Sequence, residues 1–256
     1  MPRFWFVLTI IGTIYLSTQD PQQAFAQASA QGSAPKPKRQ RTAYEDTLDT
    51  LLRERKFSEL FEAVNARDVD TMDRALEWLR VAFLERGEGT PIGYLYSNQL
   101  FRAGTTLPGL AGNAFKHAAT IMMLTTRWMV ASEGFQCEDA AAPARRLQLI
   151  NAGLARVDEH YRSLDLALKR SAAQSAFAQL KARFARRVDD DWLCAGGPTY
   201  AAAYTATHGP TSAAILPDDP QLRPAFRPVS QWQAQREGAL QKIVSYVRSE
   251  LEIELR

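Results

Sequence analysis

The chain of 256 residues has little of what catalytic and metal sites are built from. It holds only two cysteines and three histidines. No Cys-x-x-Cys, His-x-x-x-His or Gly-x-Ser-x-Gly pattern occurs in it. The usual signatures of a redox pair, a zinc site and a serine hydrolase are therefore missing. We expect no metal and no cofactor, and the sequence names no catalytic residue.

Cysteine is absent from the first hundred residues, which excludes a lipid-anchored lipoprotein. The N-terminus instead carries Arg3, an apolar run from Phe4 to Leu16 and the small-x-small sequence Ala24-Phe25-Ala26. This order is typical of a secretory signal peptide, and the run is shorter than the roughly 20 residues that cross a bilayer. We expect residues 1–26 to be cleaved and the mature protein to be periplasmic or secreted, without a membrane span. Cleavage after Ala30 and an uncleaved anchor are the alternatives.

Large apolar residues are missing from residues 27–41, which are rich in alanine, glutamine, serine, proline and basic residues. Such a segment has no face to bury. We predict a disordered basic linker there, followed by a single helical domain over residues 42–256.

The two cysteines, Cys137 and Cys194, form an even number in a chain that we expect to be exported. This favours a disulfide, with two buried thiols as the alternative. The bond would close a loop of about sixty residues and stabilise the fold by roughly 4 kcal/mol.

No strand-forming run competes with the helical periodicity, so the predicted fold is all-α, an irregular bundle of many helices. Thr42 and Glu45 form a capping-box pattern ahead of the first helix. The segment 113–131 is apolar nearly all round, which indicates a central buried helix. The glycine-rich segment 104–112 before it is interpreted as a turn.

A heptad seam follows Pro143. Apolar residues alternate three and four apart from Leu147 to Leu168, and the phase then fails at Ser171. A continuous helix over residues 143–188 would be about 69 Å long, too long for the flanking cysteines to meet. We therefore predict a disulfide-stapled helical hairpin that turns near residues 169–171. The seam faces either the bundle or a second copy in a homodimer.

Residues 195–229 contain six of the thirteen prolines and no helical period. We predict one long Pro-rich loop there, and loops of that length are usually functional or disordered. The candidate binding residues in this segment are Tyr200, Tyr204, His208 and Phe226.

The charges are unevenly distributed. Residues 44–90 carry twelve acidic and seven basic side chains, whereas residues 143–188 carry ten basic and three acidic ones. The basic segment, with Arg183, Arg186 and Arg187, is a candidate surface for an anionic partner. Alternatively the two segments pack together and their fields cancel.

We therefore expect an exported helical binding protein that engages an envelope protein or an anionic envelope component. One alternative is a peptidoglycan-type hydrolase with an unrecognised carboxylate pair; Glu133 lacks the setting of lytic transglycosylases, and Asp189 to Asp191 are interpreted as solvated surface. A second alternative is an inhibitor or immunity-type protein. Export and the lack of interleaved aromatic and basic residues argue against nucleic acid.

Overall fold

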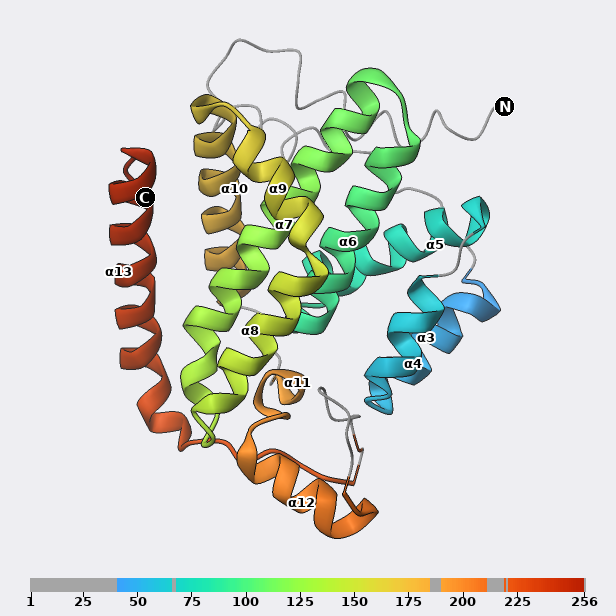
Figure 1. Cartoon of the computed structure of the whole chain (residues 1–256), viewed down its shortest axis with the longest axis vertical. Helices are drawn as coiled ribbons and strands as arrows, with labels where there is room; N and C mark the ends of the chain where they lie inside the picture. The colour runs from blue at the N-terminus through green and yellow to red at the C-terminus, as the bar shows by residue number, and fades with distance from the viewer. Residues whose placement is uncertain (1–40, 66–67, 185–189, 211–218, 220, 256) are drawn as a thin grey trace.

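The computed structural model describes residues 41–65, 68–184, 190–210, 219 and 221–255. Over these residues the fold is all-α, as predicted, with eleven α-helices and no β-strand (Figure 1). None of the described helices has the length and apolarity needed to cross a bilayer. The expected signal peptide, and residues 27–40 of the expected linker, lie outside the described residues.

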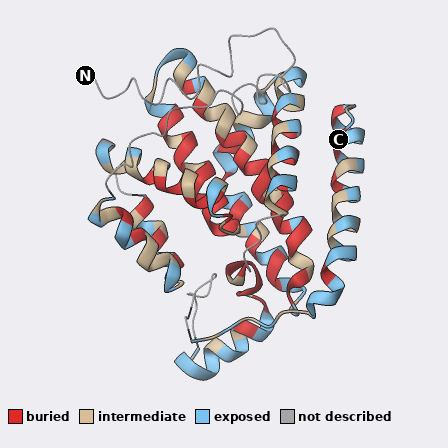
Figure 2. Ribbon diagram, turned by 180° about the vertical axis from the view of Figure 1, so that it is seen from behind, coloured by how far each residue is buried: buried red, intermediate tan, exposed pale blue. Residues whose placement is uncertain are grey.

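The centre of the bundle is α7, Gly109–Glu133, which confirms the central buried helix. It is packed against α6, α8, α9, α10 and α13, so nearly every face of it is covered. Their bounds are Thr90–Thr106 for α6, Ala141–Gly153 for α8, Ala155–Ser163 for α9, Leu166–Phe184 for α10 and Trp232–Leu251 for α13. Burial is concentrated on α6 and α7, whereas α13 is mostly exposed (Figure 2).

The glycine-rich segment 104–112 is mostly helix, and the connection between α6 and α7 is only Leu107 and Pro108. The expectation of a turn over all nine residues was wrong, because Gly104 and Gly112 lie in the two helices and allow them to pack closely. A Cβ on Gly104 would lie 2.8 Å from the carbonyl oxygen of Gly112. Only glycine lets the two helices approach so closely there.

The N-terminal helices pack on one another and on α6. They are α3 (Ala43–Arg53), α4 (Phe57–Val64) and α5 (Val69–Arg80), and α5 continues into the π-helical turn η1 (Val81–Glu85). The capping box is confirmed, since the Thr42 side chain accepts a hydrogen bond from the Glu45 N–H and Glu45 reaches back to Thr42. The chain leaves η1 at Gly87, whose φ is 80°.

The predicted turn at residues 169–171 was wrong. The chain folds back at Leu164 and Asp165, where the Asp165 side chain accepts the Leu168 N–H over 2.8 Å. Ser171 lies inside α10, so its capping pattern has no function. The seam is also interrupted at Leu154, between α8 and α9.

The helices α8, α9 and α10 pack chiefly on α7 rather than forming a two-helix seam. Every seam residue from Leu147 to Leu168 is buried or half-buried in the single chain. The stripe therefore faces the bundle, and it offers no exposed seam to a second copy.

The predicted long loop was also wrong in part, because it contains helix α12, Pro198–His208. A short helix, α11 (Asp191–Cys194), precedes it. Figure 1 shows α12 at one end of the molecule, away from the central helices. Most of its residues are exposed, so no apolar stripe was needed and none could be detected. Residues 211–218 and 220 lie outside the described part of the loop.

Candidate functional site

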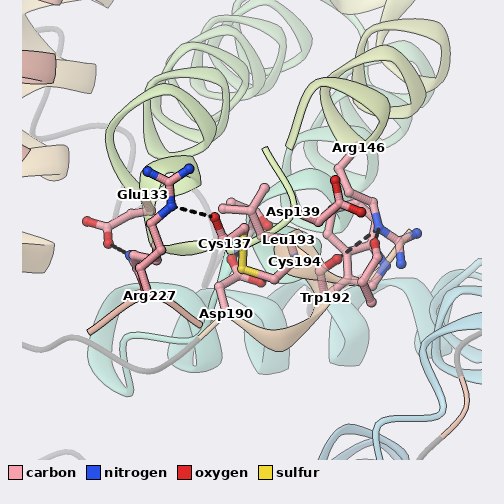
Figure 3. Close-up of a disulfide and its surroundings, with 12 residues drawn as sticks. Glu133, Cys137, Asp139, Arg146, Asp190, Trp192, Leu193, Cys194 and Arg227 are labelled. Carbon is pink, nitrogen blue, oxygen red and sulfur yellow. Dashed lines mark hydrogen bonds between the residues drawn. A yellow bond between two sulfur atoms is a disulfide. The ribbon is translucent and has the colours of Figure 1, made fainter. Parts of the chain in front are cut away.

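The disulfide between Cys137 and Cys194 is confirmed, with the two Cα atoms 5.0 Å apart and both residues buried. It joins the chain just after η2 (Gly134–Gln136), at the end of α7, to α11 (Figure 3). Residues 225–227 run antiparallel to this junction. The Glu138 N–H donates to the Ala225 carbonyl over 3.0 Å, and the Arg227 N–H donates to the Gln136 carbonyl over 2.8 Å.

Arg146 fixes the other side of the disulfide region. Its Nε donates to the carbonyls of Trp192 and Ala195 over 2.8 and 2.7 Å, and its guanidinium lies 4.3 Å from the centre of the Trp192 ring. Figure 3 places this pair beside Cys194. Although Arg146 belongs to the basic segment, it is only 4% exposed. It therefore contributes to the scaffold and not to a charged surface.

Asp190 was wrongly interpreted as solvated surface, since it is buried and caps two helices. Its carboxylate accepts the Thr90 N–H at the start of α6 over 2.6 Å and the Leu193 N–H of α11 over 3.0 Å. Burial raises the pKa of Asp190. An aspartate three residues before an apolar helical residue is an N-cap signal, and it could have identified this role.

The neighbouring acids are also paired. Asp191 lies 3.0 Å from Arg55 and 2.7 Å from Arg223. Glu133 forms a two-point ion pair with Arg236, with both oxygen–nitrogen distances 3.0 Å. Asp189 lies outside the described residues. None of the three described acids is thus left unpaired for catalysis.

Tyr200, Tyr204 and His208 share one face of α12 because they are four residues apart. Successive ring centres lie 6.5 and 4.5 Å apart. The Tyr200 hydroxyl accepts the Asp219 N–H over 2.8 Å, and His208 Nε2 lies 2.7 Å from Asp219 Oδ2. The hydrogen bond from His208 lowers the pKa of Asp219.

This stack holds α12 to the chain that follows it. Tyr200 is buried and Tyr204 half-buried, so His208 is the exposed member of the stack. Phe226 is half-buried and forms an isolated bridge with Cys137. The structure therefore brings three of the four candidate residues into one stack and leaves Phe226 at the disulfide.

Arg183 is directed into the molecule. Its guanidinium lies 3.9 Å from the centre of the Phe83 ring and donates to the carbonyls of Phe83, Gly87 and Glu88. Burial lowers its pKa to about 10. The end of α10 thus meets the backbone of the acidic N-terminal segment here. Arg186 and Arg187 lie outside the described residues.

A groove that the sequence did not reveal runs between α7 and α13, with a volume of about 480 Å³. We call it the α7–α13 groove. Trp128 and Phe135 come from the α7 side, and Ile243 and Tyr246 from α13. Tyr246 is 61% exposed. The other described residues that line the groove are small or uncharged, apart from Lys242.

A second hollow of about 400 Å³ has a different chemistry, since arginines and carboxylates line it. We call it the charged cleft, and it lies where the end of α3, the start of α6 and α11 meet. No group of three or more His, Cys, Asp or Glu side chains in the described part of the chain is placed to hold a metal ion.

No family model, curated protein or solved structure matches this chain. Any functional assignment must therefore rest on the chemistry of the two hollows.

Proposed function

We propose that this protein is an exported, periplasmic or secreted binding protein that holds an apolar segment of an envelope protein in the α7–α13 groove. The observation that carries the proposal is the lining of that groove. It combines aromatic walls with an exposed tyrosine, and none of the described residues that line it is an acid or a histidine. Apolar grooves of this kind suit recognition of a helix or an extended peptide.

The small residues of the groove favour a polypeptide as the occupant. Ala131, Ala234 and Gly238 let another backbone approach closely, and a Cβ on Gly238 would meet nothing within 4 Å. The lining residues of α13 run from Ala234 to Tyr246, about 18 Å along the helix axis. That length accommodates about three turns of a partner helix. Because Lys242 is the only cationic residue among the described residues that line it, the groove is a poor site for an anionic surface.

The disulfide supports export, because such bonds persist in oxidising compartments. The hydrolase alternative loses support because Glu133, Asp190 and Asp191 are all engaged in structural contacts. The inhibitor alternative is a special case of the binding proposal, in which the bound protein is an enzyme or a toxin. The partner's identity separates the two.

The test fills the groove without disturbing the fold. Gly238→Leu places a side chain in open space, and Gln241→Leu adds a leucine on the same helix at an exposed position that does not line the groove. Tagged mature protein is used to capture partners from the envelope fraction, with cross-linking and mass spectrometry. We expect one partner cross-linked through Lys242, lost in Gly238→Leu and retained in Gln241→Leu.

If Gly238→Leu and Gln241→Leu captured the partner equally well, the α7–α13 groove would not be the binding site. Loss of capture in Arg186→Gln/Arg187→Gln, with strong weakening by salt, would favour an anionic component instead. A second copy of this chain as the cross-linked species would make the groove a homodimer interface.

A further inference from the structure

The charged cleft has an apolar floor beneath its charges. Leu52, Phe57, Pro91 and Trp192 line it, and Trp192 is held rigidly by the stacked Arg146. A volume of about 400 Å³ lies within the range of small-molecule sites, which is roughly 300–1,000 Å³. The cleft is therefore large enough for a small molecule with an apolar body.

Most of the charges around the cleft neutralise one another. Arg86 lies 2.7 Å from Asp49, and Arg55 lies 3.0 Å from Asp191. Asp190 is used by the two backbone N–H groups that it caps. These groups form a fixed frame and have little capacity left for a ligand.

Glu88 is the exception among the acids. It is half-buried and lines the cleft, yet its carboxylate has no hydrogen-bond or ion-pair partner in the described part of the chain. The two arginines nearest to it are engaged elsewhere: Arg86 with Asp49, and Arg183 with three backbone carbonyls. Burial raises the pKa of Glu88, and the charges of Arg86 and Arg183 offset this shift only in part. A desolvated carboxylate with no donor is an incomplete site for a cationic group.

Arg53 is the exception among the arginines of the cleft. It is exposed at the end of α3, and within the described residues its guanidinium donates only to the Thr50 hydroxyl, over 3.3 Å. Four of its five N–H groups therefore remain available, in a geometry that matches a carboxylate. Among its described lining residues, the cleft thus presents one acid and one arginine without an ion-pair partner, next to apolar side chains.

We propose that the charged cleft binds a small zwitterion of the amino acid or short peptide class. Glu88 receives the ammonium group, Arg53 receives the carboxylate, and the apolar side chain of the ligand lies on Leu52 and Phe57. Each charged end gains a charge-assisted contact, and Glu88 gains a direct partner for its partly buried carboxylate. This site is separate from the α7–α13 groove, so neither proposal depends on the other.

The experiment is isothermal titration calorimetry of the mature protein with the dipeptide alanyl-leucine, its N-acetyl form and its C-terminal amide. Acetylation removes the ammonium charge, and amidation removes the carboxylate charge. We expect each modification to weaken binding about tenfold, the effect of one charge-assisted contact.

Variants assign the two ends. Glu88→Gln should lose the discrimination against acetylation and keep that against amidation, while Arg53→Gln should do the reverse. Glu62→Gln and Arg248→Gln are the matched controls, since both residues are exposed and neither lines the cleft. Unchanged circular dichroism and a melting temperature no lower than that of wild type confirm that the variants are folded.

Absence of binding for all three dipeptides would overturn the proposal. It would also be overturned if the amide bound as tightly as the free dipeptide, because the cleft would then be a site for cations alone. Discrimination that persists in both Glu88→Gln and Arg53→Gln would place the ligand elsewhere.

Discussion

Glu133 and Arg236 form a two-point ion pair whose side chains are only 11% and 18% exposed. Arg236→Ala removes the two-point ion-pair partner of a largely buried carboxylate. We expect a loss of about 3–5 kcal/mol in the free energy of unfolding. The matched control is Arg248→Ala, whose pair with Glu254 is more than half exposed and should contribute about 1 kcal/mol or less. Urea unfolding measures both, and equal losses would contradict the distinction.

The raised pKa of Glu88 predicts the sign of its effect on the pH dependence of stability. Its pKa is raised, mainly by burial, and the charged groups around it are Arg86, Arg183 and Asp190. The folded state therefore binds more protons than the unfolded state between the ordinary pKa and the raised one, so Glu88 lowers stability as pH rises through that window. We expect Glu88→Gln to be more stable than wild type at pH 7 and to lose this advantage near pH 4. Melting curves across this range measure the difference.

In that experiment Glu62→Gln is the control, because Glu62 is exposed on α4. An advantage of Glu88→Gln that persisted unchanged at low pH would show that the carboxylate charge is not its source. A residue that destabilises its own fold is a common mark of a functional site.

At the residue scale, the sequence predicted a side chain's role correctly where that role depends on residues a few positions away in the chain. The capping box of Thr42 and Glu45 is such a case. Asp190 and Arg183 were misjudged because their burial is created by partners about a hundred residues away. No local pattern records contacts at that separation.

At the scale of elements, the contact between α6 and α7 depends on Gly93. A Cβ at this position would lie 2.5 Å from Thr126 Oγ1 and 2.6 Å from Phe83 Cε2. We expect Gly93→Ala to cost about 1–3 kcal/mol through overpacking. Gly238→Ala on α13 should instead stabilise by about 0.5–1 kcal/mol, because the new methyl group meets nothing and alanine favours the helix. Thermal unfolding compares the two, and a stabilising Gly93→Ala would show that the helices can separate without cost.

The elements that the sequence located best are those with a strong pattern, such as α7. The turn of the hairpin was placed about five residues too late, because Leu168 continues the apolar seam although the chain has already reversed at Asp165. Helix α12 was missed because its exposed alanine and threonine residues carry no periodic signal. The α7–α13 groove was missed because it is formed by two helices about a hundred residues apart in the chain.

At the scale of the whole molecule, composition and periodicity were enough for the all-α class and the cysteine count was enough for the disulfide. Both follow from properties that the chain carries independently of its packing. The distribution of charge over the surface does not, because Arg146 and Arg183 are both directed inward. A net charge counted along the sequence therefore overstates the basic surface of this fold.

The disulfide gives the last prediction, which concerns the whole chain. Cys137 and Cys194 are 57 residues apart in sequence, and the loop that they close contains α8, α9 and α10. Removing the bond increases the conformational entropy of the unfolded chain, so Cys137→Ala/Cys194→Ala should lose about 4 kcal/mol. Wild-type protein unfolded in the presence of a reductant is the control and should give a similar value. Hydrogen exchange should rise first at α11 and residues 225–227, which are held at the bonded junction. A loss below about 1 kcal/mol in both samples would mean that packing on α7 alone restrains these helices even in the unfolded ensemble.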